Sequence, residues 1–134
     1  MLLVAMFFIA CATKTEKNDQ DDFTILQIAG VEIYNGLSYS IQDVTIKIPD
    51  SGDFVSCGEV LPASSCATSF PLREYTGDKV QVSWKENGQE FSTAEFRLSP
   101  PATAIAGQEA YIRVEVFAEG QAGAKLVLLP GGAD

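Results

Sequence analysis

From Phe23 onward, apolar residues alternate with polar ones in short runs, and Gly, Pro, Asn and Asp separate these runs. No stretch keeps a helical period over ten residues. Alternation with a period of two is typical of strands that bury one face. The pattern between residues 23 and 130 therefore predicts an all-β domain, a single β-sandwich of about seven to nine antiparallel strands.

The first two strands are predicted at residues 25–34 and 41–48. In the second, apolar residues such as Val44 and Ile46 alternate with polar ones, which indicates one buried and one wet face. Gly30 interrupts the first run and indicates a β-bulge at that position.

The clearest local feature is the dipeptide Asn87-Gly88 between two alternating runs, because Asn-Gly is the preferred two-residue hairpin turn. Counting outward from the turn places Trp84 opposite Phe91 on the apolar face and Lys85 opposite Glu90 on the wet face. The hairpin register is therefore predicted residue by residue.

Beyond Thr93 the apolar residues move from odd-numbered to even-numbered positions, at Ala94, Phe96 and Leu98. We predict a bulge near Ala94, because the alternative places the carboxylate of Glu95 unpaired in the core. Two further strands are predicted at residues 110–118 and, as a short apolar run, at 125–129.

The first ten residues contain no charge and lead directly into Cys11. As a helix this segment would be about 16 Å long, roughly half of a ~30 Å hydrocarbon core, so it is too short to span a membrane. It is apolar on every side and is followed by a polar stretch at residues 12–22. This pattern predicts a secretory signal peptide that is cleaved off.

The residues Phe8-Ile9-Ala10-Cys11 resemble the lipobox of bacterial lipoproteins. In that family the cysteine thiol receives a diacylglyceryl group, the preceding peptide is removed and the new amino terminus is usually acylated too, for example with palmitate. The resemblance implies a lipid on Cys11, whose two or three chains hold a protein durably at a membrane. Ala12 implies an outer-membrane location, facing the periplasm or the cell surface. A plain secreted protein is the alternative.

Residues 11–22 are polar and charged without periodicity, which predicts a flexible tether, and residues 131–134 are predicted to be a frayed tail. The chain has 9 basic and 18 acidic residues and a net charge of −9 at pH 7. This balance argues against binding to nucleic acid and against electrostatic attachment to anionic lipid.

With Cys11 assigned to the lipid, Cys57 and Cys66 remain as a pair in a chain that is exported to an oxidising compartment, which predicts a disulfide. A redox pair usually has C-x-x-C spacing, and a zinc site needs further ligands in a chain without histidine. The ring closed by the disulfide is a candidate interaction loop, comparable to the rigid loops of protease inhibitors, although its apolar residues could also pack onto the sandwich. The candidate residues are Glu59, Val60, Leu61 and Pro62.

Asp50 and Asp53 flank Ser51-Gly52, and two carboxylates around a glycine can curl around calcium. The segment lacks the ligand number of a full calcium loop, so a solvated turn is favoured and no metal or cofactor is expected.

The body resembles the small immunoglobulin-like or fibronectin-like modules of bacterial envelope proteins, through Val31-Glu32-Ile33-Tyr34-Asn35 and Asp43-Val44-Thr45-Ile46. Histidine is absent, and neither a nucleophile elbow nor a phosphate-binding glycine loop is present. We therefore expect a non-catalytic binding or structural module in the cell envelope, with a protein partner of unknown identity. The alternatives are an inhibitor or ligand-binding lipoprotein that acts through the Cys57 to Cys66 loop and, third, an envelope hydrolase.

Overall fold

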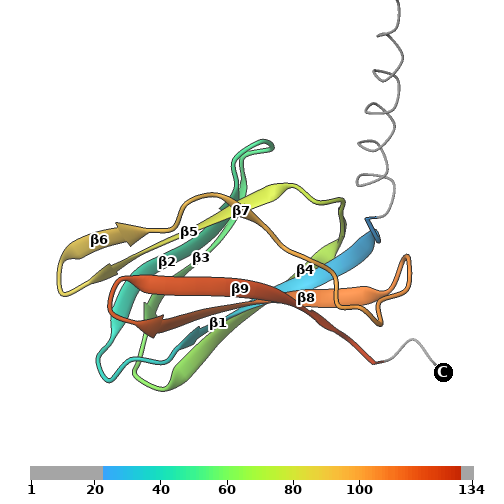
Figure 1. Cartoon of the computed structure of the whole chain (residues 1–134). Coiled ribbons are helices and arrows are strands. Elements are labelled where there is room, and N and C mark those ends of the chain that lie inside the picture. The colour runs from blue at the N-terminus through green and yellow to red at the C-terminus, as the bar shows by residue number, and fades with distance from the viewer. Residues whose placement is uncertain (1–22, 131–134) are drawn as a thin grey trace, which may run out of the picture.

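The computed structural model describes residues 23–130, which form nine strands in two facing sheets and contain no helix (Figure 1). The strands are β1 (Leu26–Asn35), β2 (Ile41–Ile48), β3 (Asp53–Val60), β4 (Ser64–Tyr75), β5 (Lys79–Glu86), β6 (Gln89–Ser92), β7 (Phe96–Arg97), β8 (Glu109–Ala118) and β9 (Gln121–Leu128). The predicted β-sandwich is confirmed. The predicted signal peptide, the lipid site at Cys11, the tether and the tail lie outside the described residues.

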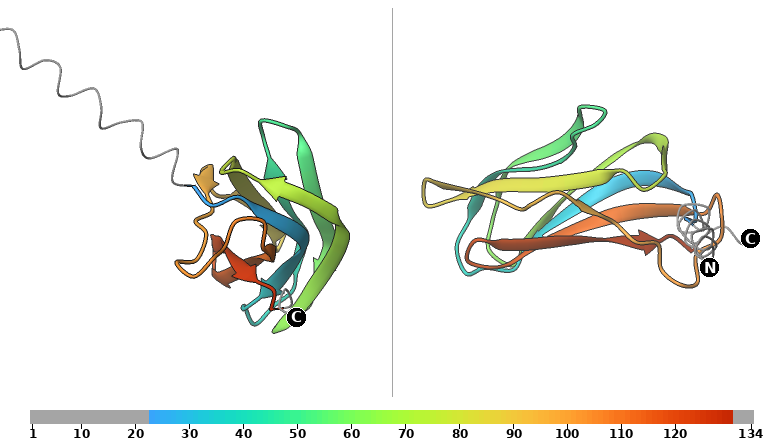
Figure 2. Two further views of the ribbon diagram at one scale, coloured as in Figure 1. Left: turned by 90° about the vertical axis from the view of Figure 1, so that its right-hand side faces the viewer. Right: turned by 45° about the horizontal axis from the view of Figure 1, so that its top comes forward.

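One sheet has the strand order β4-β1-β8-β9, and the other has the order β3-β2-β5-β6, with β7 also paired to β5. The chain crosses between the sheets from β1 to β2, β3 to β4, β4 to β5 and β7 to β8. The two layers and the crossings are visible in Figure 2. Strand order thus differs from the ABED and CFG sheets of constant-type immunoglobulin domains, so the likeness to such modules is one of architecture.

The strands pair in an antiparallel manner throughout the described residues except for β1 and β8, which are parallel. Gln27 lies opposite Glu109, and the register continues to Asn35 opposite Val116. The prediction of antiparallel strands is therefore wrong for this one pairing. A parallel pair joins distant parts of a chain, and alternation of residue types does not encode which distant strand becomes the neighbour.

The core consists of the inward faces of both sheets. On β8, Ala110, Val114 and Val116 are fully buried while Tyr111 and Arg113 point the other way and keep some exposure. The alternation of apolar and polar residues in the sequence therefore matches the alternation of buried and outward-facing side chains on this strand. Each fully buried valine, leucine or isoleucine side chain contributes about 1.5–3 kcal/mol to stability.

Gly30 is the site of the predicted bulge in β1. The register of β1 shifts between Ile28 and Gly30 against both neighbouring strands. A Cβ atom at Gly30 would lie 2.5 Å from the backbone oxygen of Thr68, which is closer than atoms can approach. The glycine is therefore required by close contact with β4 rather than by an unusual backbone angle.

The predicted hairpin register is confirmed, because Trp84 lies opposite Phe91 and their ring centroids are 5.8 Å apart. Asn87 and Gly88 have φ angles of 51° and 83°, the left-handed conformation that this two-residue turn requires.

The predicted bulge that follows the hairpin is also present. Ser83 pairs with Ser92, whereas Val80 pairs with Phe96, so one additional residue lies on the β6 to β7 side. Glu95 is exposed to solvent. The shift of parity therefore reflects a bulge and not a buried carboxylate.

The last strand is longer than predicted, because β9 begins at Gln121 rather than near Lys125. After Gln121, its first half consists of small residues, Ala122, Gly123 and Ala124, which have little intrinsic preference for strands. They adopt the strand because they pair with the residues from Val114 to Val116 on β8.

A hydrogen-bonded carboxylate closes one end of the sandwich. Glu86 on β5 is buried and accepts hydrogen bonds from Trp84 Nε1 (2.7 Å), the Tyr39 hydroxyl (2.8 Å) and the Gly120 amide (3.0 Å). Burial by itself would raise the pKa of Glu86, but these three donors together hold it below its ordinary value. The hydrogen bond to the carboxylate raises the pKa of the Tyr39 hydroxyl.

Asn35, fully buried at the end of β1, extends this polar network. Its Nδ2 atom donates to the backbone oxygens of Tyr39 (2.8 Å) and Val60 (3.0 Å), and its Oδ1 atom accepts from the Leu37 amide (2.9 Å). One side chain thus holds the β1 to β2 and β3 to β4 crossings together. Buried backbone groups at this end are satisfied by side chains.

We expect Glu86→Gln to lower the free energy of unfolding by about 1–3 kcal/mol at pH 7, because one buried and two partly buried donors lose their charged acceptor. Since the pKa of Glu86 is lower in the folded state, its charge stabilises the fold above the unfolded pKa of about 4.5. That contribution disappears as the pH falls through the folded pKa. Urea unfolding at several pH values should show the difference between the two proteins shrinking below about pH 4.5.

The matched control is Glu90→Gln on the same hairpin, where the side chain is 78% exposed and lies 4.0 Å from Lys85. This exposed pair should contribute less than about 0.5 kcal/mol. Equal effects of the two substitutions at pH 7 would contradict the structural role given to Glu86.

Candidate binding cleft

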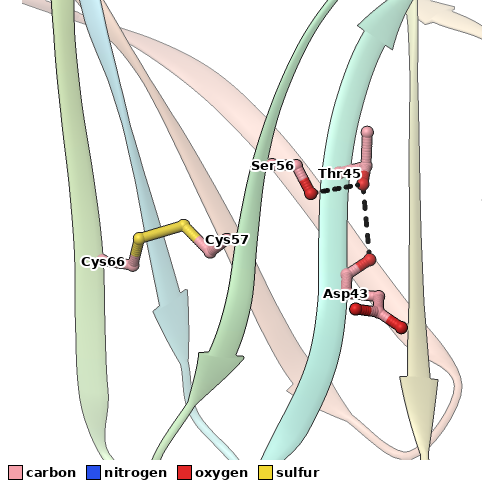
Figure 3. Close-up of a disulfide and its surroundings, with 5 residues drawn as sticks. All are labelled: Asp43, Thr45, Ser56, Cys57 and Cys66. Atoms are coloured by element: carbon pink, nitrogen blue, oxygen red, sulfur yellow. Dashed lines mark hydrogen bonds between the residues drawn. A yellow bond between two sulfur atoms is a disulfide. The ribbon is translucent and has the colours of Figure 1, made fainter.

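The disulfide between Cys57 and Cys66 is present and joins the two sheets. Cys57 lies on β3, the edge strand of one sheet, and Cys66 lies on β4, the edge strand of the other (Figure 3). Their Cα atoms are 6.5 Å apart. The predicted bond is confirmed, but it clamps two strands instead of stapling a surface loop.

The connection between these strands is shorter than the predicted interaction loop. β3 continues to Val60 and β4 begins at Ser64, which leaves only residues 61–63 as a turn. Val60 is 2% exposed, so the expectation that it is displayed to a partner is wrong. It lies opposite Ile41 and breaks the alternation of β3, in which Val55 and Cys57 face inward. The buried positions of β2 also change parity between Ile41 and Val44, where Asp43 has a φ angle of 52°.

Glu59, Leu61 and Pro62 are exposed, as the prediction required. Leu61 is 56% exposed and is the large apolar side chain that this turn presents. The turn itself is anchored, because Asn35 also reaches the Leu61 backbone oxygen at 3.3 Å. A single exposed leucine is a small surface for an inhibitor.

The calcium candidate, Asp50 with Asp53, lies at the turn between β2 and β3. The Asp53 carboxylate accepts a hydrogen bond from the Arg73 guanidinium at 2.7 Å, so an arginine of β4 is its partner. Asp50 is exposed. In the part of the chain that the structure describes, no three His, Cys, Asp or Glu side chains gather as a metal site would require.

Beyond the disulfide, β3 and β4 leave an opening between the two sheets, which we call the β3–β4 cleft. Its volume is about 650 Å³, within the range of pockets that bind ligands. Its floor is the apolar core itself, contributed by strands of both sheets. The floor residues are Ile28, Val31, Ile46, Val80 and Ile112.

The cleft exists because β4 departs from regular pairing. Ile28 lies opposite Arg73 and Gly30 lies opposite Ser69, so three residues, Phe70 to Leu72, stand against Ala29 alone. The central residue of the three is proline, which has no amide hydrogen for a ladder. The strand bulges here and does not close over the core.

The rim of the cleft combines apolar side chains with one ion pair. Leu72 is 48% exposed and Phe54 on β3 is 68% exposed, while Phe70 is half-buried. The pair formed by Asp53 and Arg73 spans the mouth from β3 to β4. Both charged side chains are about half exposed, so this pair contributes little to stability.

Tyr75 ends the cleft on β4, and its hydroxyl is already engaged. Burial raises the pKa of this phenol, which donates to the Asp78 backbone oxygen and accepts from the Leu98 amide. Phe23, the first described residue, packs edge-on against the Tyr75 ring at 5.8 Å. The described part of the chain therefore begins close to this end of the cleft.

Sequence reasoning did not identify the cleft. Its floor and rim come from six strands, and the residues that form it share no motif. One signal was present in the run from Phe70 to Leu72, where two large apolar residues flank a proline inside a strand. Proline in a strand indicates an edge or a bulge.

Comparison with known proteins places this chain in no family, since no family model and no curated protein matches it. Among solved structures, the NMR structure of the protein from Eubacterium rectale is similar, with 12% sequence identity and a TM-score of 0.44. The similarity covers 81% of this chain and 93% of that chain. Within residues 23–130 the structure has no helix that could cross a membrane.

We expect replacement of both Cys57 and Cys66 by serine to lower the free energy of unfolding by about 2.5 kcal/mol, because the unfolded chain loses a closed loop. Urea unfolding with and without a thiol reductant measures this. The reductant should bring the unmodified protein to the stability of the double variant and leave the double variant unchanged. A reductant effect on the double variant would contradict the assignment.

Proposed function

We propose that this chain is a lipid-anchored lipoprotein of the cell envelope, whose β-sandwich is a non-catalytic module that binds an apolar protein segment in the β3–β4 cleft. The lipid attaches at Cys11, and the leader of residues 1–10 is removed. The location that fits best is the outer membrane, with the body facing the periplasm or the cell surface.

The observation that carries the proposal is the β3–β4 cleft of about 650 Å³, whose floor is the buried apolar core. On its rim, Leu72 is 48% exposed and leaves apolar surface without a partner. Burial of that surface is favourable by about 25 cal/mol per Å². Exposed apolar patches with a polar rim are typical of sites that bind proteins or other apolar ligands.

The chemistry of the rim supports binding rather than catalysis. The charged pair Asp53 and Arg73 neutralises itself, and the Tyr75 hydroxyl is held by two backbone groups. The sequence offers no histidine as a general base. What the cleft presents to a partner is apolar surface, one arginine and one carboxylate.

The length of chain between Cys11 and the sandwich, and the disulfide within the sandwich, both agree with a lipid anchor outside the cytosol. Eleven residues separate Cys11 from Phe23, and an extended chain of that length reaches about 40 Å at most. The cleft would therefore lie within a few tens of ångströms of the membrane. A disulfide that clamps the two sheets is typical of proteins outside the cytosol.

The anchor is tested with Cys11→Ser. Mass spectrometry of the unmodified protein purified from native membranes should show an acylated N-terminus at Cys11. The serine variant should lack the mass of the lipid. In a detergent phase separation it should move from the detergent phase to the aqueous phase, because the acyl chains are what holds the protein durably at a membrane. An unmodified mature chain that starts elsewhere would exclude the lipoprotein assignment.

The cleft is tested by crosslinking in intact envelopes followed by purification of the tagged full chain. Leu72→Ser should reduce the recovery of crosslinked partner at least about fivefold, because it removes apolar surface from the rim. Phe117→Ser is the matched control, since Phe117 is 54% exposed and does not line the cleft. Equal recovery with both variants would refute binding at the cleft.

A further inference from the structure

We propose that one end of the sandwich rests on the surface of the lipid bilayer, with the side chains of Ile105 and Ile25 in contact with lipid. This end consists of residues 23–25, 76–78, 98–108 and 129–130, and we call it the loop end. The inference rests on the lipid anchor of the proposed function, because it states which face of the anchored body turns to the membrane.

Hydrogen bonds and packing hold the four segments of the loop end together. The Gly107 amide donates to the Ile25 oxygen at 2.8 Å, and the Leu129 amide donates at 2.9 Å to the first residue of β8. A Cβ atom at Gly77 would lie 3.3 Å from the Phe23 ring, so these two residues are in contact. Figure 2 shows the start of β1, the connection from β7 to β8 and the end of β9 at the same end of the molecule.

The connection from β7 to β8 has the composition of a surface that contacts lipid. No residue from Leu98 to Gln108 is charged, in a chain where 20% of the residues are. Its exposed residues are Ser99, Ala102, Thr103, Ile105, Ala106 and Gly107.

Two large apolar side chains are exposed at the loop end. Ile105 is 69% exposed, the highest value among the large apolar residues that the structure describes, and Ile25 is 40% exposed. The hydrogen bond from Gly107 to Ile25 keeps the two segments adjacent. An exposed apolar patch of this kind is typical of sites that contact a membrane or a protein.

The loop holds Ile105 in a fixed position. The Ala104 amide donates to the Pro101 oxygen at 3.0 Å, and the Gln108 amide donates to the Ile105 oxygen at 2.9 Å. The Ile105 amide in turn donates to the Gln108 side-chain oxygen at 3.0 Å. Because the loop is ordered before any contact, insertion of Ile105 into lipid costs little conformational entropy.

The position of the anchor favours a lipid surface as the partner of this end. The described chain begins at Phe23, within the loop end, and eleven residues separate Phe23 from Cys11. The turn at Asn87-Gly88 lies at the far end of β5, about 26 Å along that strand. An anchored body meets the membrane at high local concentration, so a small apolar contact is sufficient to orient it.

Two cations lie directly behind the apolar loop. Lys79 and Arg97 are opposite each other in the pairing of β5 with β7, and both are exposed. Within residues 23–130 neither forms an ion pair. Like charges directly opposite each other destabilise a sheet, so this arrangement is unfavourable for folding alone. Beside a membrane their long side chains reach the phosphate groups while the loop contacts the acyl region.

The charges that border the loop end indicate a neutral, zwitterionic lipid surface. The exposed carboxylates of Asp78 and Glu109 balance the charges of Lys79 and Arg97, although the whole chain has a net charge of −9. The remainder of the body repels anionic lipid at low salt. Contact should therefore be strongest on zwitterionic vesicles and insensitive to salt there.

The test uses the full chain purified from native membranes, with its lipid at Cys11 verified by mass spectrometry. The protein is placed in phosphatidylcholine vesicles that contain a lipid with a nitroxide below the head group. A fluorophore is attached at Ile105→Cys or, for comparison, at Phe117→Cys near the far end of β8. Cys57 and Cys66 do not react, because they form a disulfide.

The nitroxide should quench the label at position 105 at least about threefold more strongly than the label at position 117, because only the loop end contacts lipid. A body that turns freely on its anchor would give equal quenching at the two positions. The result should be the same at low and high salt.

A second label position measures the contribution of the isoleucine itself. With the fluorophore at Ala106→Cys, Ile105→Ser should lower the quenching at least about threefold, and Ile105→Leu should preserve it. Phe117→Ser is the matched control and should leave the quenching unchanged, since Phe117 is 54% exposed at the other end of β8. Circular dichroism should show the fold unchanged in each variant, because both side chains are mostly exposed.

Equal quenching at positions 105 and 117 in a lipidated chain would overturn the inference and leave the anchor intact. Unchanged quenching in Ile105→Ser, or contact that disappears at high salt, would also overturn it. A mass spectrum without lipid at Cys11 would refute the anchor and this inference together. The two failures are therefore distinguishable.

Discussion

The covalent link between the edges of the two sheets is the constraint on which the shape of the molecule depends. Cys57 and Cys66 hold β3 and β4 together at one point, with their Cα atoms 6.5 Å apart. On one side of this point the chain crosses directly from β3 to β4 through a short turn. On the other side β4 bulges at Pro71, and the β3–β4 cleft lies above the core. One bond thus divides the edge into a closed and an open part.

The closed end is held by buried polar groups rather than by further apolar packing. Glu86 accepts three hydrogen bonds, and Asn35 joins two of the crossings between the sheets. Tyr39 belongs to both sets, since its backbone oxygen serves Asn35 and its hydroxyl serves Glu86. Satisfied networks of this kind favour one arrangement of the connections, because any other arrangement leaves buried groups unpaired.

The rigidity of the closed end also affects the cleft at the open end. A cleft bounded by a clamped edge strand is preorganised, so a partner that enters it orders few additional groups. The described residues begin at Phe23, beside Tyr75 at the end of the cleft. In the proposed envelope lipoprotein, the anchor and the cleft would therefore lie close together.

The sequence by itself determined the features that depend on near neighbours along the chain. These are the alternating strands, the Asn87-Gly88 hairpin with its register, the bulge at Gly30 and, by cysteine count, the disulfide. Only the tertiary structure decided the parallel pairing of β1 with β8, the early start of β9, the burial of Val60 and the cleft. The physical reason is that local patterns specify which face of a strand is apolar, whereas the choice of neighbouring strand depends on packing between residues far apart in the chain.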